Sequence, residues 1–150
     1  MDFLQEQALL YSSQRYENIY FHFNEAYGIK YHEFFLLCAT IGFKNNRLEA
    51  FTKKGREFRT NYFNTKQKVS FYTMLLCDNE LGRDLEAFSD PEFISMARKK
   101  IQFYAEGGMS ILVESVFKSR FDGHYLDETY TDYDVDVLMY INDQATTVPF

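Results

Sequence analysis

Apolar positions recur every three or four residues through most of the chain, the spacing of one face of an amphipathic helix. Between residues 16 and 27 this face consists of Ile19, Tyr20, Phe23, Ala26 and Tyr27. Gly28 follows, and glycine readily adopts the left-handed conformation that ends helices. The pattern predicts a helix over 16–27 that stops at Gly28.

Two further segments are apolar enough to be central helices. Residues 31–43 place Phe34, Phe35, Cys38 and Ile41 on one side, which makes this segment the best candidate for the core. Residues 67–79 repeat the pattern, and Gly82 is the expected stop.

A strong helix start stands at Ser89-Asp90-Pro91-Glu92. Ser89 or Asp90 can accept hydrogen bonds from the free amides, and Pro91 suits the first turn. We expect Gly107-Gly108 to break or kink this helix, which then resumes over 109–121.

The remaining segments are less regular. Residues 44–55 predict a polar loop, followed by a short helix over 56–63. Residues 133–137 alternate like a strand, yet Thr131 and Asp134 fit a capping box before a helix. Helix is favoured because no other segment offers a sheet for this one to join.

These patterns predict a mostly α protein, a compact single-domain bundle of about five to seven helices with little or no sheet. Residues 1–121 would form the helical domain, containing a basic segment at 44–68. Residues 122–150 would form an acidic C-terminal segment that is helical or partly mobile.

Composition adds an aromatic load of 16 Phe and 12 Tyr in 150 residues. Such side chains supply cores and also interfaces.

Cys38 and Cys77 lie in apolar runs, which fits buried, reduced thiols. The first residues show no basic stretch followed by an apolar one, and no apolar run has the length of a membrane helix. The sequence predicts a cytoplasmic protein without a membrane segment.

Charge is distributed unevenly along the chain. Residues 44–68 hold half of the 16 basic residues and carry net +6, whereas residues 122–150 carry net −7. A basic surface attracts polyanions even on an acidic molecule. The candidate contacts for DNA or an acidic partner are Lys44, Arg47, Lys53, Lys54, Arg56, Arg59, Lys66 and Lys68.

Two other interpretations of the charges stay open. The basic segment is either a plain solvated face or a contact for the acidic tail, within the chain or between subunits. The tail acids Asp132, Asp134 and Asp136 are candidate contacts for a basic partner.

Catalytic patterns are missing from the sequence. His22, His32 and His124 do not have the spacing of zinc ligands, and the acids of 122–136 lack the calcium-loop arrangement. Phosphate-binding, serine-nucleophile and Glu-x-Lys nuclease motifs are also missing. We therefore expect a protein that is not an enzyme and needs no metal or cofactor.

Residues 16–63 combine an amphipathic helix, a glycine turn, an apolar helix ending in Gly-Phe and a basic stretch leading to Glu-x-Arg. The positions that carry this order are Gly28, Ala39, Gly42, Phe43, Arg47, Lys54, Glu57, Arg59 and Phe63. Together with FYAEGGMSIL at 103–112, they resemble the small accessory proteins of bacterial DNA phosphorothioation (sulfur-modification) antiphage loci. The resemblance implies an accessory subunit that binds DNA or docks onto larger defence subunits, with a homodimer or higher oligomer as one arrangement.

The helix, glycine turn and helix are also similar to ribbon-helix-helix DNA-binding proteins. The preceding residues 9–15 contain one base, Arg15, and alternate weakly, which departs from a groove-reading ribbon. Two alternatives remain beside the accessory role. One is a ribbon-helix-helix-like transcriptional regulator, and the other is a phage-encoded inhibitor that acts by protein contact or acidic DNA mimicry.

Overall fold

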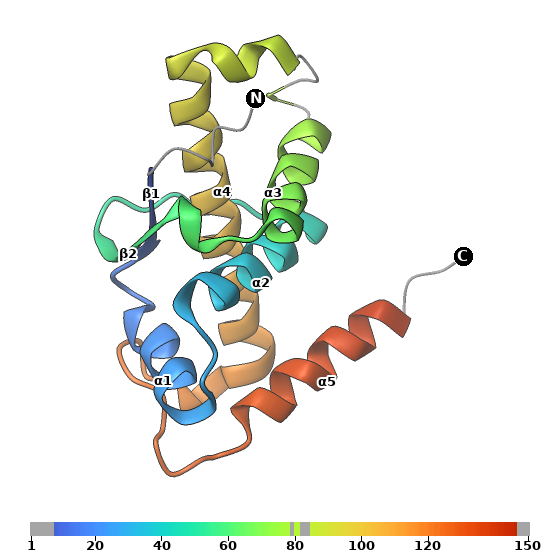
Figure 1. Ribbon diagram of the computed structural model, residues 1–150. Helices are drawn as coiled ribbons and strands as arrows, with labels where there is room; N and C mark the ends of the chain where they lie inside the picture. The colour runs from blue at the N-terminus through green and yellow to red at the C-terminus, as the bar shows by residue number, and fades with distance from the viewer. Residues whose placement is uncertain (1–7, 79, 82–84, 147–150) are drawn as a thin grey trace.

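A computed structural model describes residues 8–78, 80–81 and 85–146 (Figure 1). The chain folds into one mostly helical domain, as the sequence predicts, and it also contains a two-stranded sheet. The main elements are β1 (Leu9–Ser13), α1 (Glu17–Tyr27), α2 (Tyr31–Lys44), β2 (Lys54–Arg59), α3 (Thr65–Cys77), α4 (Pro91–Leu112) and α5 (Tyr133–Thr146). Short turns of helix lie at Thr60–Tyr62, Leu85–Ser89, Val113–Phe117 and Lys118–Arg120.

The locally encoded helices lie where the sequence predicts them. Gly28 ends α1 with φ 68°, and its amide donates to the Asn24 carbonyl. The Asp90 side chain accepts from the Glu92 amide at the start of α4, with Pro91 in the first turn. The helix predicted at 67–79 is α3, which ends at Cys77, while the expected stop at Gly82 lies outside the described residues.

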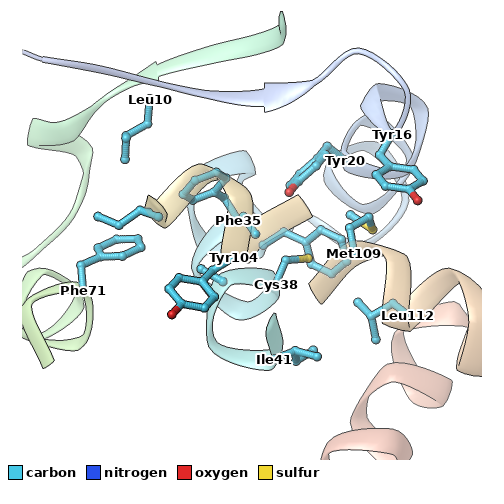
Figure 2. Packing of buried hydrophobic residues seen from close by; sticks show 14 of the residues in the cluster. Leu10, Tyr16, Tyr20, Phe35, Cys38, Ile41, Phe71, Tyr104, Met109 and Leu112 are labelled. Atoms are coloured by element: carbon cyan, nitrogen blue, oxygen red, sulfur yellow. The ribbon is translucent and has the colours of Figure 1, made fainter. Parts of the chain in front are cut away.

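The expected break at Gly107-Gly108 is wrong, because α4 continues through both glycines to Leu112. A Cβ on Gly108 would lie below 3.0 Å from the Cys38 carbonyl, and one on Gly42 would meet the Tyr104 carbonyl in the same way. The glycines therefore serve close packing of α4 on α2. Figure 2 shows Cys38 of α2 and Tyr104 and Met109 of α4 in one cluster. Beyond Leu112, Val113–Phe117 forms a wider π turn instead of a resumed α-helix.

The short helix expected over 56–63 is also wrong for its first half. Residues 54–59 form β2, which pairs antiparallel with β1, and Leu10 lies opposite Phe58. Both side chains are buried, and the Phe58 ring packs against Phe35 of α2 at 4.7 Å between centroids. Tertiary pairing overrides the local pattern here. Helical geometry is limited to the 3₁₀ turn at Thr60–Tyr62.

The acidic C-terminal segment contains the predicted helix, α5, and this helix belongs to the core. Tyr133 is fully buried, and its ring lies 5.6 Å from Phe117 and 5.3 Å from His22. The Tyr27 hydroxyl donates to the Thr131 carbonyl at 2.9 Å and accepts from the Tyr133 amide. The start of α5 is therefore fixed against α1.

Cys38 is buried, as predicted, whereas Cys77 is exposed at the end of α3. In the part of the chain that the structure describes, no helix combines the length and the apolar character needed to cross a membrane.

Candidate functional site

A groove of about 1180 Å³ runs between the β1–α1 connection, the 49–53 loop and the 123–125 turn. Its lining includes cations, carboxylates and aromatic rings from segments far apart in the sequence. The members that matter most below are Arg15, Phe21, Glu49, Lys53, Arg56 and Tyr125.

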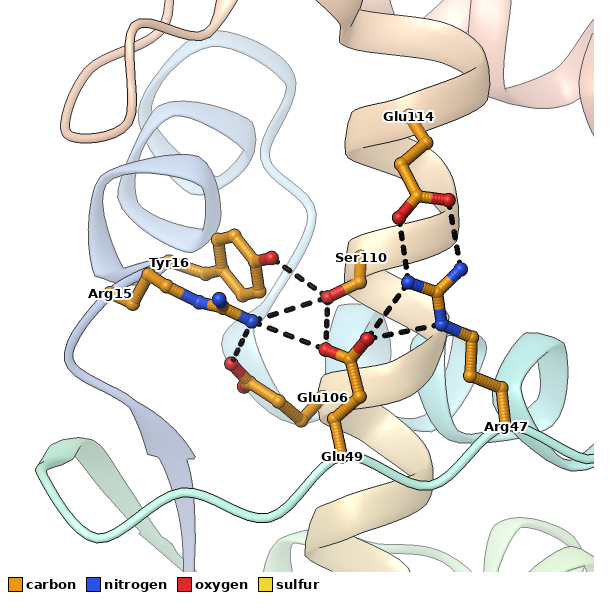
Figure 3. A network of polar contacts seen from close by, with 7 residues as sticks. All are labelled: Arg15, Tyr16, Arg47, Glu49, Glu106, Ser110 and Glu114. Carbon is orange, nitrogen blue, oxygen red and sulfur yellow. Dashed lines mark hydrogen bonds and ion pairs between the residues drawn. The ribbon is translucent and has the colours of Figure 1, made fainter.

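The inner wall of the groove is a network of charges centred on Arg15 (Figure 3). One guanidinium nitrogen of Arg15 lies 3.2 Å from Glu49 and 3.1 Å from Glu106. The Ser110 hydroxyl accepts from Arg15, donates to Glu49 and is hydrogen bonded to the Tyr16 hydroxyl. The network links the start of α1 and the 49–53 loop to α4.

The two carboxylates of this network differ in environment. Burial raises the pKa of Glu106, which is only 4% exposed, although Arg15 partly opposes the change. Burial alone would also raise the pKa of Glu49, but hydrogen bonds from Ser110 and Arg47 outweigh it and place the pKa below its usual value. Arg15 is one cation against the two carboxylates that it contacts, so it offsets only part of their charge and the inner wall is formally negative.

Arg47, a predicted binding residue, is paired with carboxylates of the same chain, although its side chain is 33% exposed. Its guanidinium makes paired hydrogen bonds to Glu114 at 2.6 and 2.8 Å, and it also donates to Glu49. These bonds raise the pKa of Arg47 above its ordinary value. The backbone of Arg47 also covers Gly107, where a Cβ would collide with its carbonyl. The geometry gives Arg47 a structural role.

We expect Arg47→Ala to lower the free energy of unfolding by about 1–2 kcal/mol, mainly because Glu49 loses charged hydrogen bonds while partly buried. Urea unfolding measures this change. Lys44→Ala removes a neighbouring exposed cation and serves as the control, with an effect within about 0.5 kcal/mol. Equal stabilities of the two variants would contradict the structural role.

Four of the other predicted cations lie on or beside the antiparallel pair of β1 and β2. Its strands are joined through α1 and α2 instead of by a tight turn, and we call this pair the hairpin for short. Lys53 and Arg56 line the groove, and both are exposed. The Lys54 ammonium lies 4.3 Å above the Tyr11 ring, and the Arg56 guanidinium lies 4.0 Å above the Tyr31 ring. Arg59 is exposed at the far end of β2. Aromatic contacts orient two of these cations while leaving their charges uncompensated.

The remaining predicted cations lie on other elements and do not line the groove. Lys44 is the last residue of α2, and Lys66 and Lys68 lie in the first turns of α3. The basic segment of the sequence is therefore divided among several surfaces. We call Lys53, Lys54, Arg56 and Arg59 the hairpin cations.

The candidate acids of the tail lie at the start of α5. Asp136 accepts from the Tyr130 hydroxyl at 2.6 Å, and Asp134 accepts from the Val135 amide. Negative side chains are favourable at a helix N-terminus, which accounts for this position. Figure 1 shows α5 apart from the hairpin, and Arg47 takes its carboxylate partners from Glu49 and Glu114 instead of from the tail.

Sequence reasoning missed the aromatic part of the groove. Phe21 is 48% exposed and Tyr125 is 65% exposed. The sequence contains a signal for Phe21, because this aromatic residue falls outside the apolar face of its helix. Tyr125 had no such signal, since a turn brings it to α1 from a distant part of the chain.

Within residues 8–78, 80–81 and 85–146, no three His, Cys, Asp or Glu side chains are placed to hold a metal ion. β1 pairs with β2 along one edge, and on its other edge the Tyr11 amide donates to the Gln102 side chain.

Comparison of the chain with protein-family models, curated proteins and solved structures finds no match. The resemblance to phosphorothioation accessory proteins remains a prediction from the sequence.

Proposed function

We propose that the protein binds DNA without catalysing a reaction, as an accessory or adaptor subunit of a bacterial antiphage defence system. The contact surface would be the hairpin cations, not the whole basic segment. The observation that carries the proposal is that Lys53 and Arg56 line the groove together with exposed aromatic rings. Cations beside aromatic side chains are the usual composition of surfaces that bind nucleic acid backbones and bases.

Two features of the hairpin support this choice over the alternatives. Arg56 is held over Tyr31 and donates to its hydroxyl at 2.9 Å, so its charge has a fixed position for a phosphate. A ribbon shared between two protomers would need a free edge of β1, but one edge pairs with β2 and the Tyr11 amide on the other donates to Gln102. The hairpin cations also discourage edge-to-edge pairing of β2. That is a purely structural role, and the binding experiment distinguishes it from DNA binding.

The proposal is tested by fluorescence anisotropy with a labelled duplex of about 30 base pairs at roughly 50 and 200 mM salt. We expect salt-sensitive binding. Lys53→Ala with Arg56→Ala should weaken it and reduce the log–log salt slope by about 0.9 for each phosphate that the variant no longer neutralises.

The matched control is Lys66→Ala with Lys99→Ala, which removes two exposed cations from α3 and α4. It changes the net charge equally but leaves the hairpin intact, so its slope should equal that of the unmodified protein. An identical slope for both double variants would reject the hairpin surface. An absence of binding at low salt would reject duplex DNA as the partner.

A further inference from the structure

We propose that the groove takes an unpaired, single-stranded stretch of DNA, with bases stacked on Phe21 and Tyr125 and phosphates held by Lys53 and Arg56. This inference rests on the proposed DNA binding and specifies the form of DNA. It follows from the position of the two rings, from the fixed backbone that carries them and from the distribution of charge around them.

The two rings are exposed, although most aromatic side chains that the structure describes are buried or half-buried. Phe21 stands on α1, away from the buried residues Ile19, Tyr20 and Phe23. Tyr125 comes from the 123–125 turn, and both rings line the same groove. Large apolar side chains that share an exposed concave surface mark a binding site more often than isolated ones do.

The turn that carries Tyr125 is fixed to the helix that carries Phe21. The Asp122 carboxylate accepts from the amides of His124 and Tyr125 at 2.8 and 2.7 Å. The next amide, of buried Leu126, donates to the Asn18 side chain on α1 at 2.8 Å. The backbone positions that carry the two rings are thus fixed relative to each other before a ligand arrives, which lowers the entropic cost of binding.

The charges indicate where the phosphates lie. Arg15 is exposed but paired with Glu49 and Glu106 on the inner wall, whereas the exposed Lys53 and Arg56 form no ion pair with the residues that the structure describes. Glu17 also lines the groove and repels phosphate at its own end. The backbone is therefore expected along the Lys53 and Arg56 side, with the bases turned toward the rings.

Single-stranded DNA fits these features better than a duplex does. Base faces are available for stacking on side chains only when the bases are unpaired. The groove, at about 1180 Å³, also exceeds the roughly 300–1,000 Å³ of a typical small-molecule site. A segment of a chain suits this volume better than one small ligand.

The experiment compares three labelled probes by anisotropy: a thymidine oligonucleotide of about 12 residues, an abasic backbone of the same length, and a duplex. The abasic probe keeps the phosphates and lacks the bases. We expect the thymidine strand to bind roughly tenfold or more tightly than the abasic strand, as stacking on two rings implies.

Phe21→Ala and Tyr125→Ala should each reduce affinity for the thymidine strand by about fivefold or more and leave the abasic affinity unchanged. Tyr62→Ala removes a ring that is 56% exposed outside the groove and serves as the control, with no effect on either probe. Circular dichroism establishes that the variants fold.

The outcomes separate this inference from the proposed function. Equal affinities for the thymidine and abasic strands would overturn base stacking and leave salt-sensitive DNA binding standing. Tighter binding of the duplex than of the thymidine strand would also overturn it. An absence of binding to all three probes would reject both proposals.

Discussion

Replacing Gly108 with alanine is expected to lower the free energy of unfolding by about 3 kcal/mol, near the upper end of the range for overpacked cores. In an ordinary helix the same change would add roughly 1 kcal/mol of stability, because alanine favours the helix. The close approach of α4 to α2 reverses the sign. The new methyl group would collide with the backbone carbonyl of Cys38, which cannot rotate away as a side chain can.

Urea or thermal unfolding followed by circular dichroism measures this effect. Gly28→Ala is the matched control, because its Cβ would meet nothing within 4 Å and only the positive φ of 68° opposes it. We expect that variant to lose roughly 1 kcal/mol. If Gly108→Ala costs no more than Gly28→Ala, the close contact of α2 with α4 is refuted.

Tyr133→Ala is expected to cost about 3–5 kcal/mol of unfolding free energy, the range for removing a large aromatic side chain from a core. The ring is fully buried against Phe117, Tyr130 and His22, so its loss leaves a cavity. Its hydroxyl also donates to the Asp127 carbonyl at 2.8 Å.

Chemical denaturation of two variants separates the ring from the hydroxyl. Tyr133→Phe keeps the ring and should cost only about 1 kcal/mol for the missing hydrogen bond. Val135→Ala on the exposed face of α5 should change stability by less than about 0.5 kcal/mol. A Tyr133→Ala variant as stable as Val135→Ala would show that α5 is a dispensable appendage.

The result for Tyr133 affects how the acidic segment can be studied. Removing residues 131–150 would remove a core residue, so a change in DNA binding after truncation would reflect unfolding as well as charge. Replacing Asp132 and Asp134 with asparagine alters the charge and keeps the core intact. Asp136 is less suitable, because Tyr130 donates to it.

Elements whose signals are local could be predicted from the sequence. The periodic apolar face, the glycine stop at 28 and the Asp90-Pro91 start each act within a few residues, and the corresponding helices form where expected. The assignment of 56–59 fails because β2 depends on pairing with a strand about 45 residues earlier in the chain. The glycine pair was misinterpreted for the same reason, since its partner lies on another helix.

For the candidate site, too, properties of single residues could be predicted and contacts between distant residues could not. The density of lysine and arginine is enough to select the hairpin cations as candidates, because charge is a property of each residue alone. It also included Arg47, whose partner Glu114 lies 67 positions away and is visible only in the fold. The groove needs the 123–125 turn to meet α1 through Asn18, a contact that spans 108 positions and has no trace in local periodicity.

Tyr133 packs between α1 and Phe117, and this position affects how the chain folds during its synthesis. Ribosomes release the chain from its N-terminus, so the helices that form this part of the core emerge before the residue that completes it. Until residues 126–137 leave the exit tunnel, Phe117 and the adjoining face of α1 lack their cover. The nascent chain therefore passes through a stage with an unfinished aromatic core, during which chaperone binding would be most useful.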